Sequence, residues 1–257
     1  MKMPVVFVGH GSPMNIIERN RFTEGWIQMA AKLPKPRAIV CISAHWFTDG
    51  QSVSTAEQPE TIYDFYGFPE ELYQLTYPAP GAPATAGRVA GLLGPATGKE
   101  SRRGLDHGAW SVLRFMFPQA DIPVFQLSVN QLNSPQASYQ AGGKLKPLRD
   151  EGVLILGSGD VVHNLQLVNW EMPNGYPWAE SFDAYIKGAL LAHNADEVIN
   201  YERAGIREQK SFYYRDHFDP LLYCLGATEA SDSVEVYNEA TVLGALSMTS
   251  YLWQDSE

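Results

Sequence analysis

Four short runs of apolar residues constrain the fold of this chain more than any other feature. They cover 5–8, 38–42, 122–129 and 153–156, are rich in Val, Ile and Leu, and are bounded by turn-forming residues. Their apolar residues are continuous rather than alternating, which is typical of strands covered on both faces. The runs therefore predict a sheet with helices packed on either side.

The segments between these runs show helical periodicity. Apolar residues recur at the spacing of a helix face over 22–33 and 182–190, with shorter stretches at 89–93 and 110–117. Residues 233–237 and 243–252 are expected to form a hairpin, or a strand followed by other structure, and 48–83 to be a long, functional coil. The alternation indicates an α/β sandwich with a mostly parallel or mixed sheet, in one large domain or two small ones.

The charge balance argues against polyanionic partners. The chain has 19 Lys and Arg residues against 29 Asp and Glu residues, a formal net charge of −10, and no long basic run. Binding to nucleic acid or to an anionic membrane surface needs a basic face, so neither is expected. No apolar run approaches the ~20 residues of a membrane-spanning helix, and the apolar stretch near the start is too short for a signal peptide. The two cysteines, Cys41 and Cys224, lack metal or redox spacing, which favours core positions and a cytoplasmic protein.

Three histidines stand in the same topological position. His10, His45 and His163 each follow one of the predicted strands. A single histidine after a strand is usually a hydrogen-bonded loop residue. Ligands of open α/β sheets bind at the carboxyl ends of the strands, however, and imidazole is the commonest side-chain metal ligand. The repeated placement therefore favours a metal site at one edge of the sheet.

Other candidate residues leave two interpretations open. His107 and His217 each follow an Asp, which either orients the imidazole or is instead a helix cap or a solvated residue. His193 lies near a predicted helix end, where packing or an interaction with the helix dipole is favoured. An aromatic group could line a substrate pocket or simply cover the sheet; it comprises Tyr63, Phe65, Tyr66, Phe68, Tyr73 and Tyr77.

Five short segments carry most of these histidines: GHGSPM at 9–14, SAHW at 43–46, DHGAW at 106–110, VHNL at 162–165 and HFDPL at 217–221. In this order, over nearly the whole chain, they resemble the class III (LigB-type) extradiol ring-cleavage dioxygenases, in the branch of the 4,5-DOPA extradiol dioxygenases. The resemblance implies a single catalytic domain over 1–257 that binds one divalent metal ion, Fe(II) or Zn(II).

The resemblance also implies roles for the histidines. His10, His45 and His217 would be metal ligands, and His163 either a fourth ligand or a general base. His107 would line the pocket as a proton donor or oxygen-orienting group. An all-imidazole set differs from the 2-His-1-carboxylate triad of ferrous oxygenases and suits zinc better.

The implied reaction is the cleavage of a catechol such as DOPA by O2 to a muconic semialdehyde, in a monomer or small homo-oligomer. His163 or His107 would accept a phenolic proton. Two rival interpretations remain at this point. A zinc hydrolase would use the cation to activate water without O2, and a non-enzymatic binding protein would use the pocket of the same fold to dock a ligand.

Overall fold

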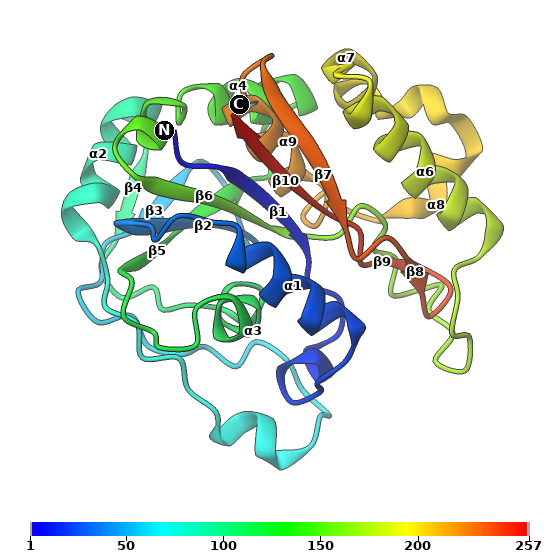
Figure 1. Ribbon diagram of the computed structural model, residues 1–257, viewed down its shortest axis with the longest axis horizontal. Helices are drawn as coiled ribbons and strands as arrows, with labels where there is room; N and C mark the ends of the chain where they lie inside the picture. The colour runs from blue at the N-terminus through cyan, green and yellow to red at the C-terminus, as the bar shows by residue number, and fades with distance from the viewer. Residues whose placement is uncertain (1, 256–257) are drawn as a thin grey trace.

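A mixed eight-stranded sheet forms the centre of the protein (Figure 1). The computed structural model describes residues 2–255, apart from the side chains of 206–209. The order across the sheet is β4-β3-β5-β2-β6-β1-β10-β7, and β8 and β9 form a separate two-stranded sheet. The strands are β1 (Val5–Gly9), β2 (Ala38–Thr48), β3 (Ser52–Ser54), β4 (Gly98–Glu100), β5 (Val124–Asn130), β6 (Val153–Gly159), β7 (Asp232–Tyr237), β8 (Thr241–Val242), β9 (Leu246–Ser247) and β10 (Ser250–Asp255).

The four central strands are the four apolar runs of the sequence. β5, β2, β6 and β1 lie side by side and run parallel. The outer strands add antiparallel pairs, because β10 is antiparallel to β1 and to β7, and β3 is antiparallel to β5. The prediction of a mostly parallel or mixed sheet between helices is confirmed.

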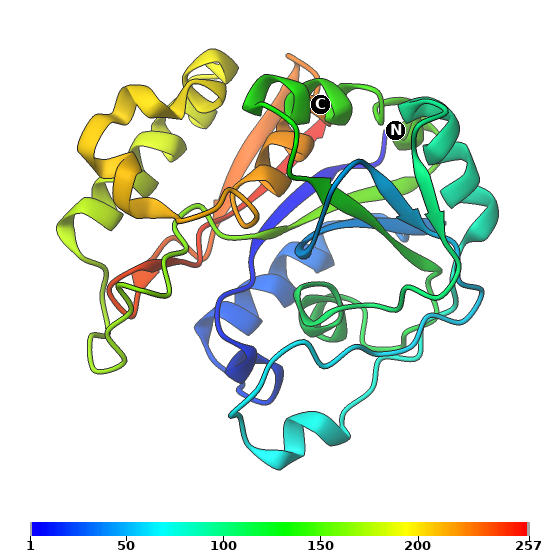
Figure 2. The same ribbon diagram turned by 180° about the vertical axis from the view of Figure 1, so that it is seen from behind.

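Helices cover both faces of this sheet (Figures 1 and 2). α1 (Arg21–Ala31) and α3 (His107–Met116) contribute buried residues to the core on one face. α2 (Pro83–Leu93), α6 (Pro177–Leu191) and α9 (Asp219–Ala227) do so on the other face. The remaining helices are α4 (Pro135–Gly143), α5 (Pro147–Asp150), α7 (Ala195–Ile199), α8 (Glu208–Ser211) and the 3-10 helices η1 (Pro13–Ile16), η2 (Glu70–Gln74) and η3 (Tyr201–Arg207).

The sequence of β1 shows why the sheet must be covered twice. Val5 and Phe7 are buried in the core beneath α9, whereas Val6 and Val8 are buried in the core beneath α1 and α3. Successive side chains of a strand point to opposite faces. A run without polar residues therefore needs an apolar layer on each side, and the two helical layers provide it.

The structure departs from the predicted elements where the local pattern is weak. The expected coil over 48–83 is interrupted by β3 and η2. β3 has only three residues, too few to show a period. α9 went unpredicted because all nine of its residues are buried, so it has no polar face to reveal a helical period. The C-terminal prediction holds in part: β7 and β10 pair antiparallel, with the β8–β9 pair between them in the chain.

Within residues 2–255, no helix is both long and apolar enough to span a membrane.

Candidate metal centre

The carboxyl ends of three neighbouring strands form the base of the site. β2, β6 and β1 are adjacent and parallel, so their carboxyl ends share one edge of the sheet. His10 directly follows β1, His45 lies near the end of β2, and Asp160 directly follows β6. The structure brings together all five histidines named as site candidates, whose rings form a chain of contacts: His10, His45, His107, His163 and His217.

His217 reaches this edge from the segment before α9. The backbone N–H of Asp160 donates to the carbonyl of His217 over 3.0 Å. A Cβ atom at Gly159 would lie only 2.1 Å from the same carbonyl oxygen. Gly159 is therefore required for the close approach that places His217 beside the strand ends.

The proton positions around His10 leave its Nε2 without a proton. The Ser158 hydroxyl donates to the carbonyl of Gly108 over 2.5 Å, so its own oxygen must accept from His10 Nδ1, 3.0 Å away. A neutral imidazole carries one proton, and here it is on Nδ1. The lone pair of His10 Nε2 therefore points into the site.

This lone pair faces other electron-rich atoms. Nε2 of His45 lies 3.1 Å from Nε2 of His10, and Asp160 Oδ2 lies 3.9 Å from it. Asp160 Oδ1 accepts from the backbone N–H of Gly11, but Asp160 Oδ2 is buried without a hydrogen-bond partner. Neither ring nitrogen of His217 has a hydrogen-bond partner either. Buried polar atoms are rarely left this way.

A cation could bind one nitrogen of each of these imidazoles. The possible ligand atoms of His10, His45 and His217 lie within 4.8 Å of one another, as do those of Asp160, His163 and His217. Two imidazole nitrogens 3.1 Å apart can both bind one metal ion at the usual bond length of ~2.1 Å. The donor set fits a divalent transition metal.

His163 lies in a different relation to the cluster. Its ring is parallel to that of His217, with 3.4 Å between the centroids and 4° between the planes. An imidazole lone pair lies in the plane of its ring, so two rings stacked in this way cannot both direct a lone pair at one point between them. The stack therefore favours only one of the two as a ligand in this conformation.

Burial keeps four imidazoles of the cluster neutral, those of His10, His45, His163 and His217. Desolvation lowers the pKa of His45 to about 3 and that of His163 to about 4, with further lowering by neighbouring histidines. The pKa values of His10 and His217 are also well below the ordinary value, because of desolvation and then the other imidazoles. Only the neutral ring binds a metal ion, so this environment leaves these imidazoles able to bind one.

The two Asp residues beside histidines have different roles. Asp106 is the N-cap of α3 and accepts from the backbone N–H of Ala109, so its carboxylate does not contact the neighbouring His107. Asp216 Oδ1, by contrast, lies 3.1 Å from Nδ1 of His217. The helix-cap interpretation is correct for the first pair. In the second pair the carboxylate lies close to the imidazole without forming a hydrogen bond to it.

Sequence reasoning missed three residues of the site, which are Asp64, Ser158 and Asp160. Asp64 Oδ1 accepts from Nδ1 of His107 over 3.0 Å, and Asp64 Oδ2 lies 3.3 Å from Nδ1 of His45. Burial acts to raise the pKa of Asp64, but the hydrogen bond from His107 and the nearby imidazoles outweigh it and lower the pKa to about 2. Asp160 could have been found, since it lies four residues after a predicted strand, between that strand and His163.

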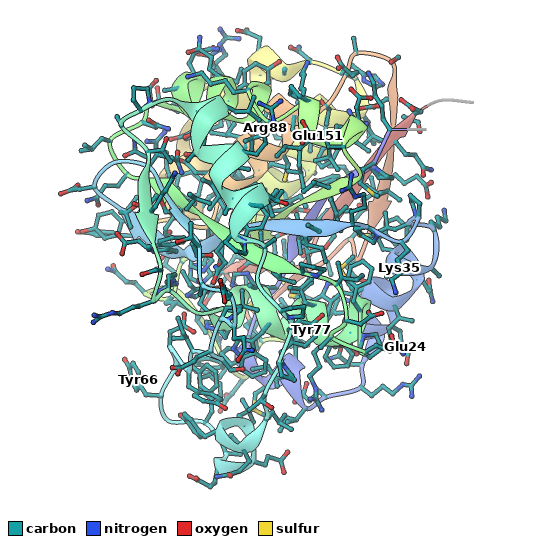
Figure 3. All side chains as sticks on the ribbon, turned by 90° about the vertical axis from the view of Figure 1, so that its left-hand side faces the viewer. Glu24, Lys35, Tyr66, Tyr77, Arg88 and Glu151 are labelled. Carbon is teal, nitrogen blue, oxygen red and sulfur yellow. The ribbon has the colours of Figure 1, made fainter. Side chains whose placement is uncertain are left out.

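The aromatic group mainly covers the sheet. Phe65 and Tyr77 are buried in the core on the α3 side, and Tyr63 packs against it. Figure 3 shows Tyr66 projecting away from the body of the molecule and Tyr77 turned inward; Tyr66 is 91% exposed. Phe65 alone is at the site, with its ring centroid 5.5 Å from that of His107. His193 is exposed just after α6, which argues against a packing role.

The protein is an α/β sandwich, and a buried histidine cluster lies at the carboxyl edge of its parallel strands. This combination is typical of a metal-dependent enzyme. Residues 4–252 match the family described as the catalytic LigB subunit of aromatic ring-opening dioxygenase. The chain belongs to this family, and the resemblance drawn from the five histidine-bearing segments is confirmed.

Individual relatives agree with the family match. The chain is 44% identical to a 4,5-DOPA dioxygenase extradiol of Escherichia coli, over 97% of this chain and 94% of that protein. It is 40% identical to the protein of the same name from Beta vulgaris, over 95% and 94% of the two chains. A crystal structure of an uncharacterized Escherichia coli protein superimposes with a TM-score of 0.85 and 39% identity, covering 98% of this chain and 99% of that one.

The protein is thus an extradiol dioxygenase, and the enzyme class expected from the sequence is confirmed. The family acts on aromatic rings and depends on a metal, for which the described residues offer suitable donor groups. The hydrolase and binding-protein interpretations receive no support.

Proposed function

We propose that this enzyme cleaves the ring of a DOPA-like catechol with O2, at a divalent metal held by His10, His45 and His217 beside the Asp160 carboxylate. One observation carries the proposal. One ring nitrogen from each of His10, His45 and His217 lies within 4.8 Å of the others, close enough to bind a single cation, and the ring nitrogens of His217 have no hydrogen-bond partner.

Fe(II) is the proposed metal of the active enzyme. A ferrous ion bound there would supply the redox chemistry toward a catechol and O2 that zinc lacks. The Asp160 oxygen brings a carboxylate within 3.9 Å of His10 Nε2. With this carboxylate, the donor set is closer to the histidine-and-carboxylate sites of ferrous oxygenases than a set made of imidazoles alone. Zinc would bind to the same donors without supporting turnover.

His107 and His163 are the proposed proton-transfer groups. His107 donates its Nδ1 proton to Asp64, which leaves Nε2 free to accept a proton from a catechol hydroxyl. The ring of His163 is stacked on that of His217, next to the proposed ligands but outside the plane of the His217 ring. One of these two imidazoles accepts the proton of the second catechol hydroxyl. It can return that proton to the substrate when the ring opens.

The setting of the enzyme is also part of the proposal. Cys41 and Cys224 are both free and buried, which fits a reducing cytoplasm. We take residues 1–257 as one catalytic domain, acting as a monomer or small homo-oligomer on a small aromatic substrate.

Anaerobic reconstitution tests the proposal. Metal-free protein is loaded with Fe(II) or Zn(II) and then exposed to air with a panel of catechols that includes DOPA and caffeic acid. We expect O2 uptake and a new visible absorption with Fe(II) only. Turnover with zinc in the absence of O2, or no ring cleavage of any catechol by the ferrous protein, would contradict it.

A further inference from the structure

A single carboxylate contacts two imidazoles of the site. Asp64 Oδ1 accepts both the Nδ1 proton and the backbone N–H of His107, over 3.0 and 2.9 Å. Its other oxygen, Oδ2, lies 3.3 Å from Nδ1 of His45. Asp64 therefore presents one oxygen to each imidazole, and both contacts are at Nδ1.

A carboxylate can only accept hydrogen bonds, so its position decides which ring nitrogen keeps the proton. A neutral imidazole with its proton on Nδ1 has its lone pair on Nε2. In His45 this is the nitrogen that faces Nε2 of His10, 3.1 Å away. With the opposite tautomer, Nε2–H of His45 would donate to Nε2 of His10 over this distance. Its proton would then occupy the space between the two nitrogens and block a cation.

We propose that Asp64 is a positioning residue that holds His45 and His107 in the same tautomer, so that one carboxylate prepares both a metal ligand and a proton acceptor. The inference rests on the proposed function for the roles of the two imidazoles. It goes beyond that function by assigning their preparation to a residue of the 48–83 segment, outside the histidine-bearing strands and helices.

The structure holds Asp64 in place from both sides. The hydroxyl of Tyr63 donates to the carbonyl of Leu75 over 2.8 Å, and the indole N–H of Trp110 donates to the carbonyl of Ile62 over 2.9 Å. On the other side, Phe65 is buried in the core. A fixed carboxylate can impose a tautomer, whereas one on an unanchored loop could not.

Asp106, the neighbour of His107 in sequence, is not available for this task. Its Oδ1 accepts from the Ser43 hydroxyl, and its Oδ2 accepts from Gln126 and Arg103. Asp64 is thus the carboxylate that the described contacts give to His107.

The first test uses the unmodified, metal-free protein. Histidine side chains labelled with ¹⁵N report directly which ring nitrogen carries the proton. We expect the Nδ1–H tautomer for both His45 and His107. The Nε2–H tautomer at either residue in the folded protein overturns the proposal, and this result needs no variant and no catalysis.

The second test replaces the carboxylate by its closest neutral analogue. In Asp64→Asn the amide has only one accepting oxygen, so at least one of the two imidazoles loses its acceptor. We expect that imidazole to change tautomer and the affinity for Zn(II), measured by chelator competition, to fall roughly 10- to 100-fold, the usual loss when a group that orients a ligand is removed. Asp64→Glu keeps the charge and should recover most of the affinity.

Asp183→Asn is the matched control, because Asp183 is a buried carboxylate that accepts from two hydroxyls, those of Ser247 and Thr249, outside the histidine cluster. It should leave both tautomers and the zinc affinity unchanged. Unchanged tautomers and affinity in Asp64→Asn overturn the inference. If instead the tautomers are as expected and no catechol is cleaved, the proposed function fails while the role of Asp64 stands.

Discussion

The imidazole of His163 lies parallel to that of His217, with their centroids 3.4 Å apart. This relationship separates two roles that the sequence leaves open for His163. A ring that stacks on the proposed ligand His217 is close to the proposed metal site, but it cannot direct its own in-plane lone pair to the same metal position.

Replacing His163 should therefore reduce turnover without removing the metal. In His163→Phe the aromatic ring can keep the stack on His217 while the proton acceptor is lost. We expect turnover of the ferrous enzyme to fall about 10²–10⁴-fold, the usual contribution of general acid–base catalysis, while zinc affinity stays near that of the wild type. His217→Ala is the comparison, and it should lose the metal. A large loss of zinc affinity in His163→Phe would show that His163 is a ligand.

Asp160 gives a prediction about metal removal. Its Oδ2 is buried without a hydrogen-bond partner, and burial raises the pKa of this carboxyl well above the usual range. An ionised carboxylate in such a place destabilises the metal-free protein unless a cation is bound nearby. Asp160→Asn keeps the oxygen that accepts from Gly11 and removes the charge.

We expect Asp160→Asn to have opposite effects on the two forms of the protein. Zinc affinity should fall by roughly 10- to 100-fold, and the metal-free protein should become more stable at neutral pH. The increase in melting temperature on adding zinc should therefore be smaller, because zinc binds more weakly and the metal-free protein is more stable. Differential scanning fluorimetry with and without a chelator measures it. An unchanged zinc-induced shift would mean that Asp160 does not interact with the metal.

The histidines of the strands could be predicted because each belongs to a local pattern. An apolar run followed closely by His10 or His163 places the side chain at the carboxyl end of its strand, and these ends share one edge of the sheet if the strands are parallel neighbours. His217 could be placed only by resemblance to a family, because the helix that follows it is buried on all sides and shows no period.

Asp64 could not be found from the sequence. It lies 43 residues before His107, in a segment whose only visible feature is its aromatic residues. Its function depends on how that segment folds back over α3, which is a tertiary contact without a sequence period. Ser158 likewise stands between two glycines, without a sequence pattern of its own. Its contacts with His10 Nδ1 and with the Gly108 carbonyl are visible only in three dimensions.

Asp183 predicts a pH dependence of stability. Desolvation raises its pKa from 3.8 to about 6 in the folded protein. Between these values the folded chain binds more protons than the unfolded chain, so the free energy of unfolding falls as the pH rises. The contribution is fully present below pH 4 and lost once the pH passes 6. Two pKa units correspond to about 3 kcal/mol.

Urea unfolding of the wild type and Asp183→Asn from pH 4 to 7 isolates this contribution, since other titrating groups are common to both proteins. The difference in free energy of unfolding should move in favour of Asp183→Asn by up to about 3 kcal/mol across this range. A difference that is constant with pH would contradict the assignment.

The last prediction concerns a buried ion pair that joins the start of the chain to β7. Arg149 donates to both oxygens of Asp232, over 2.7 and 2.9 Å, and its Nε donates to the carbonyl of Met3 over 2.8 Å. Both side chains are almost fully buried. Removing one partner of such a pair leaves an uncompensated buried charge, which typically costs 3–5 kcal/mol.

Arg149→Met should therefore lower the free energy of unfolding by about 3–5 kcal/mol, and Arg149→Lys should recover only part of it, because an ammonium cannot reproduce the forked contact. The exposed pair of Arg88 and Glu151, labelled in Figure 3, is the control. Arg88→Met should cost under about 1 kcal/mol, since exposed ion pairs contribute little. Urea unfolding measures both losses. Equal losses of unfolding free energy from Arg149→Met and Arg88→Met would show that burial does not increase the contribution of the Arg149–Asp232 pair to stability.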